Sequence, residues 1–305
     1  MAIKKTIFNS KYEEQLYKSI ESNWNSEFRI IPQLPPQQIF DLESLNITSD
    51  EKDFLYKSSI DFTVCDLLNK PIMSLEFDGI CRGISRMGEF VDGKETDDTT
   101  RKKKLDLKLR IAREENYPFY VVSYMEKNFI SNKSYLSVID GIIGQTIAHS
   151  KLDINELMEH FQSDIDALEN DEDKHEFIQD VILNAEIENE MTWDPIVKRS
   201  SHIRNVLREH NVYANGQKYE YFSEPTRTEI FGGKGKQGNQ DLSEDYKKIK
   251  WFGCRMTIDY VKNSVTKSVK IRNFEGSHAS PLIIAQNIAE LSALEEIAKR
   301  FNIVT

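Results

Sequence analysis

Apolar residues recur at four-residue intervals near the start of the chain, which predicts a helix within the first 30 residues. Asn9 or Ser10 can cap this helix at its N-terminus. Its apolar stripe consists of Tyr12, Leu16, Ile20 and Trp24. The segment IIPQLPPQQIF follows, and its prolines favour an extended connection on the surface of the fold.

The pattern becomes strand-like after a second, short helix near residues 49–58. The segments DFTVCDLL and PIMSLEFDG are both rich in strand-forming residues. Asn69 and Lys70 separate them, which predicts a β-hairpin with a two-residue turn. In the register that such a turn imposes, Asp61 faces Asp78.

A loop, a helix and a further strand are predicted next. Residues 80–100 are rich in Gly, Asp and Thr, which indicates a long irregular loop. Residues 101–115 then form a helix with Leu105, Leu109 and Ala112 on one stripe, and the β-branched and aromatic run FYVVSY follows it.

The second half of the chain is predicted to be helical over residues 135–192 and mixed α+β after that. The expected order is helix, three strands and helix, over residues 200–210, 219–222, 251–261, 267–273 and 281–301. The whole pattern predicts a first domain over residues 1–145, an acidic helical connector over 146–198 and a small α+β domain over 199–305.

The composition is that of an ordinary soluble globular protein. The chain has 305 residues, of which 39% are apolar and 30% are charged. No apolar run has the length of a membrane helix and the N-terminal segment lacks a secretory signal, so we expect a cytoplasmic protein without a membrane partner. The three cysteines lie far apart without CxxC spacing, which disfavours a disulfide framework and a thiolate zinc site.

The net charge of −10 is distributed unevenly along the chain. Residues 151–190 contain 14 acidic residues and two lysines, so the remainder is slightly positive. A positive remainder is compatible with contact to nucleic-acid phosphates. The candidate contacts are Arg82, Arg86, Arg101, Lys102 and Lys103. A solvated loop or helix start is the alternative explanation of each of them.

Three carboxylates gather at one end of the predicted hairpin, namely Asp61, Glu76 and Asp78. Like charges at this spacing repel one another unless a cation is present, and Mg²⁺ or Mn²⁺ is the natural ion for oxygen ligands. Lys104 and Lys108 share one face of the following helix, which must pack back on the same sheet. A lysine near a carboxylate-bound metal suits phosphodiester hydrolysis. The alternative is that these carboxylates are solvated residues at the end of a hairpin.

The segments DFTV, LEFDG, RKKKLDLKLRIA and YPFYVVSY together resemble the core of the PD-(D/E)XK nuclease superfamily, and more narrowly a bacterial branch of it with an E-x-D-G core. The resemblance covers roughly residues 8–145. It implies an α/β fold, a restriction-endonuclease-like mixed sheet flanked by helices in the order αβββαβ. It also implies Mg²⁺ or Mn²⁺ as the cofactor.

The same resemblance implies roles for individual residues. Asp61 and Glu76 correspond to the two acidic positions of the motif, and Asp78 stands where the parent pattern has lysine. In this branch the lysine comes from the following helix, which here means Lys108, with Lys104 as second choice. Glu13 stands where many members place an extra acidic residue, and an exposed helix residue is the alternative for it.

The C-terminal domain weakly resembles a double-stranded-RNA-binding domain in its order of elements. Its last helix begins at SHASP, without the lysines that this family uses to grip phosphates. An adaptor or dimerisation domain is the alternative, and a dimerisation domain would make the protein a homo-oligomer. The sequence therefore predicts an Mg²⁺-dependent nuclease that acts on nucleic acid, DNA rather than RNA. A non-catalytic nucleic-acid-binding or assembly protein with the same fold is the alternative.

Overall fold

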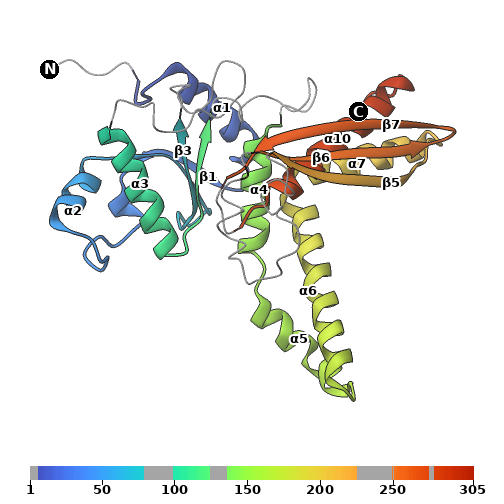
Figure 1. The fold of residues 1–305 in the computed structure, drawn as a ribbon, viewed down its shortest axis with the longest axis horizontal. Coiled ribbons are helices and arrows are strands. Elements are labelled where there is room, and N and C mark those ends of the chain that lie inside the picture. Colours follow the sequence, from blue (N-terminus) through green and yellow to red (C-terminus); the bar gives the residue numbers. More distant parts are fainter. Residues whose placement is uncertain (1–5, 79–98, 124–135, 225–248, 250, 275–277) are drawn as a thin grey trace, which may run out of the picture. The chain divides into compact units, whose positions relative to one another are not determined.

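The protein is a mixed α/β structure, and its described residues form two sheets (Figure 1). The computed structural model describes residues 6–78, 99–123, 136–224, 249, 251–274 and 278–305. The chain divides into two compact units. Unit 1 combines residues 1–139, 221–253 and 270–277, and unit 2 combines residues 140–220, 254–269 and 278–305. The domain boundaries near residues 145 and 198 stay a prediction of the sequence.

The sheet of unit 1 has the strand order β1-β2-β3-β4. Its strands are β1 (Arg29–Leu34), β2 (Ile60–Cys65), β3 (Pro71–Asp78) and β4 (Phe119–Ser123). The pairs β1/β2 and β2/β3 are antiparallel, which confirms the predicted hairpin. β4 is parallel to β3, and α3 (Thr99–Glu114) lies between them in the chain. The predicted return of the chain through a helix to the same sheet is therefore confirmed.

Strand β1 corrects one expectation from the sequence. The proline-containing segment after the first helix was predicted to be a surface connection, but Ile30 pairs with Val64 and Pro32 with Phe62. Proline lacks a backbone N–H and is tolerated in a sheet only at an edge or a bulge. β1 is the first strand in the sheet order and so offers such an edge, which makes Pro32 compatible with a strand.

Helix α1 (Lys11–Trp24) precedes this sheet and begins at the predicted cap, because the Ser10 side chain accepts a hydrogen bond from Glu13 N. The apolar stripe is buried at Leu16, Ile20 and Trp24, whereas Tyr12 is 44% exposed. Glu13, next to it, is buried instead. The helix therefore brings a carboxylate to its buried face near its N-terminus.

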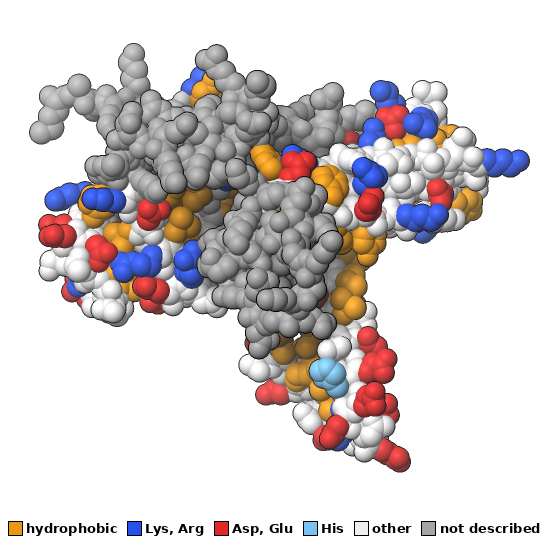
Figure 2. All heavy atoms as spheres, viewed as in Figure 1, with side chains coloured by type: hydrophobic (Ala, Val, Ile, Leu, Met, Phe, Trp, Pro, Cys, Tyr) orange, Lys and Arg blue, Asp and Glu red, His pale blue; other side chains and the backbone are white. Residues whose placement is uncertain are grey.

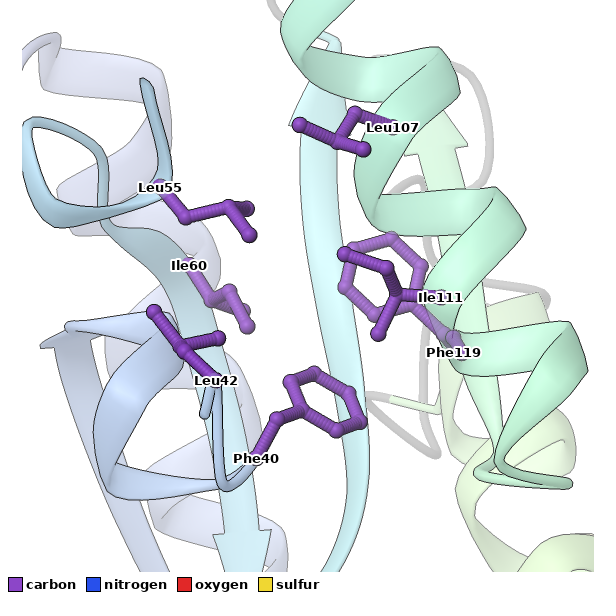
Figure 3. Packing of buried hydrophobic residues seen from close by; sticks show 8 residues of the cluster. Phe40, Leu42, Leu55, Ile60, Leu107, Ile111 and Phe119 are labelled. Carbon is purple, nitrogen blue, oxygen red and sulfur yellow. The ribbon is translucent and has the colours of Figure 1, made fainter. Parts of the chain in front are cut away.

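Helix α3 packs on a hydrophobic cluster that also includes residues before and within β2 (Figure 3). The cluster consists of Phe40, Leu42, Leu55, Ile60, Leu107, Ile111, Ala112 and Phe119. The predicted stripe of α3 was wrong in part, because Leu105 and Leu109 are only partly buried. The run LDLKL offers two helical stripes, and the sheet takes the one that contains Leu107 and Ile111. This choice also buries Lys108.

Two short elements lie between β1 and β2. They are the 3₁₀ helix η1 (Pro36–Gln38) and α2 (Ser49–Tyr56). Thr48 caps α2, and the Glu51 side chain accepts a hydrogen bond from Thr48 N in return. This capping box fixes the start of α2, whose Leu55 belongs to the cluster beneath α3.

The remaining helices and strands follow the predicted order. They are α4 (Val138–Ser150), α5 (Ile154–Ala167), α6 (Asp171–Trp193), α7 (Pro195–Glu209), β5 (Ala214–Glu224), β6 (Trp251–Tyr260), β7 (Asn263–Arg272) and α10 (Pro281–Arg300). The second sheet is antiparallel in the order β5-β6-β7, which confirms the helix, three strands and helix predicted for this part.

Helices α5 and α6 form the acidic part of the chain. Neither contains a buried residue, and Figure 2 shows acidic side chains along their visible face. These two helices account for most of the segment in which the sequence places its excess of negative charge. In the part of the chain that the structure describes, no helix combines the length and the apolar composition needed to cross a membrane.

Candidate functional site

The turn between β2 and β3 decides which carboxylates face each other. Asp66 N donates to Lys70 O over 3.0 Å, and Asp66 Oδ1 accepts from Leu68 N and Lys70 N over 2.9 and 2.8 Å. Asn69 adopts the left-handed backbone that asparagine tolerates, with φ 67°. The turn thus spans Asp66 to Lys70, and the two-residue turn predicted from the sequence is wrong.

The observed turn is centred earlier in the chain than the predicted one, and a bulge lies next to it between Val64 and Cys65, so the register of the hairpin differs from the predicted register by two positions. Phe62 pairs with Leu75, so the next residues outward place Asp61 opposite Glu76. The predicted pairing of Asp61 with Asp78 is therefore wrong. The causes are the Asp66 side chain, which organises the observed turn, and the bulge between Val64 and Cys65, which shifts the register by one residue.

Asp61 and Glu76 form a close carboxylate pair on the two strands. Asp61 Oδ2 accepts a hydrogen bond from Phe77 N over 2.8 Å, and the Glu76 side chain is only 14% exposed. Burial and the neighbouring Asp61 raise the pKa of Glu76, while Lys108 opposes the rise. The balance leaves that pKa at about 8, so the pair lacks sufficient positive charge to ionise fully at neutral pH.

Lys108 supplies the one cation in contact with this pair among the described residues. It lies on the buried face of α3 between Leu107 and Ile111 and is 6% exposed. Its Nζ donates to Glu76 Oε1 and, over 2.6 Å, to Ser59 O. Because the flanking residues belong to the hydrophobic cluster, packing of α3 on the sheet places the ammonium next to Glu76.

Glu13 extends the site from α1. It is 3% exposed, so the alternative that it is an exposed helix residue is wrong. Glu13 Oε2 accepts from Asn9 N over 3.0 Å, and Glu13 Oε1 accepts from Gln33 Nε2 over 2.5 Å. Burial and Asp61 raise the pKa of Glu13, and these hydrogen bonds lower it.

Gln33 is the residue of this site that the sequence analysis missed. Its Nε2 donates both to Glu13 and, over 3.1 Å, to Asp61 Oδ1. A polar side chain inside a strand is a signal for such a role. That signal was hidden because the segment was predicted to be a connection and not a strand.

The contacts given above for Asp61, Glu76 and Lys108 include none of the other predicted lysines among the described side chains, and the third acid, Asp78, is described only in its backbone. Lys104 Nζ lies 5.0 Å from the centre of the Phe54 ring on α2, whereas Lys108 contacts Glu76. Lys103 is exposed on α3. Asp78 ends β3, where its backbone pairs with Ser123. The side chains of Asp78, Arg101 and Lys102, and all of Arg82 and Arg86, lie outside the described residues.

The described side chains fit a divalent ion only if water and substrate supply most of its ligands. Among the described side chains, no group of three or more His, Cys, Asp or Glu could hold a metal ion. Gln33 lies between Glu13 and Asp61, which leaves Asp61 and Glu76 as the described carboxylates in mutual contact. Mg²⁺ commonly binds through one or two carboxylates and completes its shell with water and substrate phosphate. Two carboxylates therefore suffice for that mode of binding.

Comparisons with known proteins add no relative. No family model, no curated protein and no solved structure matches the chain. The resemblance to the PD-(D/E)XK nucleases thus rests on the short motifs in the sequence. Asp61, Glu76 and Lys108 are the described residues whose geometry bears most directly on function.

Proposed function

We propose that the protein is a metal-dependent nuclease that hydrolyses phosphodiester bonds of nucleic acid, with DNA as the favoured substrate. One observation carries the proposal. Two carboxylates from neighbouring strands, Asp61 and Glu76, meet a buried lysine, Lys108, that comes from the helix after the second strand. Acidic ligands beside a lysine suit metal-assisted phosphoryl chemistry.

The order of elements supports the proposal. Within unit 1 the order is α1, β1, β2, β3, α3 and β4, with α2 inserted between β1 and β2. This agrees with the αβββαβ order that the resemblance to PD-(D/E)XK nucleases implies. A shared order of elements supports a fold, whereas the activity is argued from the residues of the site.

Asp61 and Glu76 are the residues that would hold Mg²⁺ or Mn²⁺. When bound there, the ion would polarise a phosphate oxygen and lower the pKa of a water molecule. The hydrogen bond from Phe77 N to Asp61 Oδ2 holds one carboxylate, and the Lys108 ammonium contacts the other. The chain thus presents both groups in fixed positions before any substrate binds.

Lys108 has the geometry to act on the reacting phosphate. An ammonium has three N–H donors, and in the described residues two of them go to Glu76 and to Ser59 O. The third is available to orient the attacking water or to neutralise the charge that develops on the pentavalent phosphate. The contacts of Arg82, Arg86, Arg101, Lys102 and Lys103 with the nucleic-acid backbone stay a prediction.

A cleavage assay tests the proposal. Purified protein is incubated with labelled duplex DNA, single-stranded DNA and RNA, in Mg²⁺, in Mn²⁺ and in EDTA. We expect cleavage that needs the metal and is lost in the Asp61→Ala/Glu76→Ala variant. Glu43→Ala/Glu220→Ala changes the charge equally at exposed side chains and should leave cleavage intact. The proposal fails if the two double variants cleave alike, or if the wild type cleaves none of these substrates.

A second function has one observation in its favour. Glu76 already receives positive charge from Lys108, and the described residues contain no cluster of three acidic or other metal-binding side chains. A protein that binds nucleic acid or assembles on it without turnover would need no metal site beyond the contact between Lys108 and Glu76. Tight binding of the same labelled substrates without cleavage in either metal would favour that alternative.

A further inference from the structure

Gln33 has an uncommon backbone for a residue in a strand. Its φ is 55°, in the left-handed region that L side chains other than Asn and Asp rarely adopt. The residue lies in β1 next to Pro32, which itself pairs with β2. Costly backbone conformations of this kind persist where the surroundings enforce them, and they concentrate at functional sites.

The side chain of Gln33 uses both ends of its amide. Its Oε1 accepts from Ser59 Oγ over 2.6 Å. Its Nε2 donates to Glu13 Oε1 over 2.5 Å and to Asp61 Oδ1 over 3.1 Å. Carboxylates can only accept from the amide, and the serine hydroxyl can donate to its oxygen, so the orientation of the amide is fixed from both ends.

This amide completes the support of Asp61. Gln33 Nε2 holds Oδ1, and Phe77 N holds Oδ2 over 2.8 Å. With a donor on each oxygen, the plane of the Asp61 carboxylate is set relative to Glu76 on the adjacent strand. The same amide nitrogen also links Asp61 to Glu13, so that the buried Glu13 and the partly buried Asp61 both accept from one NH₂ group.

We propose that Gln33 is a positioning residue of this site, which holds Asp61 in the orientation needed for metal binding and keeps Glu13 beside it. The inference rests on the proposed nuclease function. Ser59 belongs to the same arrangement, because its hydroxyl orients the amide while its carbonyl accepts from Lys108 Nζ. A residue that only fastened β1 to its neighbours would contribute to stability and leave the turnover of the folded protein unchanged.

Three substitutions separate these roles. Gln33→Met keeps the length of the side chain and removes both polar atoms. Gln33→Gly removes the side chain but favours the left-handed backbone, so it isolates the amide from the conformation of β1. Ser59→Ala frees the oxygen of the amide and leaves the Ser59 carbonyl in place. Thermal unfolding of each variant gives the folded fraction to which its rates are referred.

We expect Gln33→Met and Gln33→Gly to lower kcat for DNA cleavage by about 10- to 100-fold, the usual effect of losing an outer-shell partner of a metal ligand. KM for DNA should change by less than about twofold, because Gln33 acts through Asp61 and Glu13. Isothermal titration calorimetry should give weaker Mg²⁺ binding by about tenfold or more. Ser59→Ala should give a smaller loss of the same pattern.

A readout without metal or substrate completes the test. Loss of the Gln33 donor should raise the pKa of Glu13 further, as followed by NMR titration of the side-chain carboxyl carbons in Gln33→Met. Unchanged kcat, Mg²⁺ affinity and Glu13 titration in the folded Gln33 variants would overturn the proposal. If neither variant folds, the same three readouts in Ser59→Ala decide it. A wild type that neither binds Mg²⁺ nor cleaves refutes the proposed function, and that result is visible without any Gln33 variant.

Discussion

Binding of Mg²⁺ should expel a proton from Glu76 at neutral pH. Burial and Asp61 raise the pKa of Glu76 to about 8, so in the metal-free protein this carboxyl is largely protonated at about pH 6.5. A metal ion binds the ionised form. Each pH unit below the raised pKa should therefore weaken the apparent Mg²⁺ affinity by about tenfold. At about pH 6 the loss is roughly 100-fold, or ~2.7 kcal/mol at ~1.36 kcal/mol per unit.

Calorimetry in two buffers measures this proton directly. Mg²⁺ is titrated at about pH 6.5 into protein in two buffers whose heats of ionisation differ, and the difference in the observed heats counts the protons released. We expect a count near one at this pH and near zero at about pH 9.5, where Glu76 is already ionised. Glu76→Gln should abolish the release, whereas Glu43→Ala, on a fully exposed acid of lowered pKa, should leave it unchanged. A pH-independent Mg²⁺ affinity with no proton released would show that Glu76 is already ionised in the metal-free protein.

Three further predictions concern single residues. Lys108→Met should lower the cleavage rate by about 100-fold or more and destabilise the fold by about 3 kcal/mol above pH 8, because the two carboxylates lose their cation. Lys104→Met should have neither effect. Single-turnover rates and urea unfolding measure both effects. The buried Asp194 carboxyl has a pKa raised to about 7, so its contribution to stability is complete below its ordinary pKa of 3.8 and is lost as the pH rises through 7. Asp194→Asn keeps a side-chain acceptor for Ile196 N and should make the melting temperature nearly independent of pH over this range. If the variant keeps the pH dependence of the wild type, the raised pKa of Asp194 is wrong. Ile111→Ala should cost about 2 to 5 kcal/mol in urea unfolding and Leu105→Ala clearly less, and equal losses would mean that the buried stripe of α3 is wrong.

The sequence predicted the hairpin and the lysine from strong local signals. The two strand-forming segments β2 and β3 are close in the chain, and the next helix has to return to their sheet, which limits where its lysines can lie. Spacing alone therefore placed Lys104 and Lys108 on one face of this helix, and the resemblance gave Lys108 its role. The choice of Lys108 over Lys104 did not follow from spacing, because LDLKL contains two apolar stripes and only the packed core selects between them.

The register of the hairpin and the formation of strand β1 depend on interactions that the local sequence pattern does not contain. The Asp66 side chain organises the turn through two backbone N–H groups, and this turn together with the bulge between Val64 and Cys65 pairs Asp61 with Glu76 instead of Asp78. Pro32 argues against a strand unless the strand is known to be an edge, and this depends on the whole sheet. Gln33 was missed for the same reason, since its role exists only once β1 lies beside β2.

The proposed nuclease activity depends on Asp61 and Glu76 together. Single-turnover cleavage of a labelled DNA duplex, with protein in excess and Mg²⁺ varied from zero upward, tests it most directly. We expect a rate that rises with Mg²⁺ to a plateau for the wild type and stays at the EDTA background for Asp61→Ala/Glu76→Ala. A rate independent of Mg²⁺, or one that the double variant retains, would contradict this expectation.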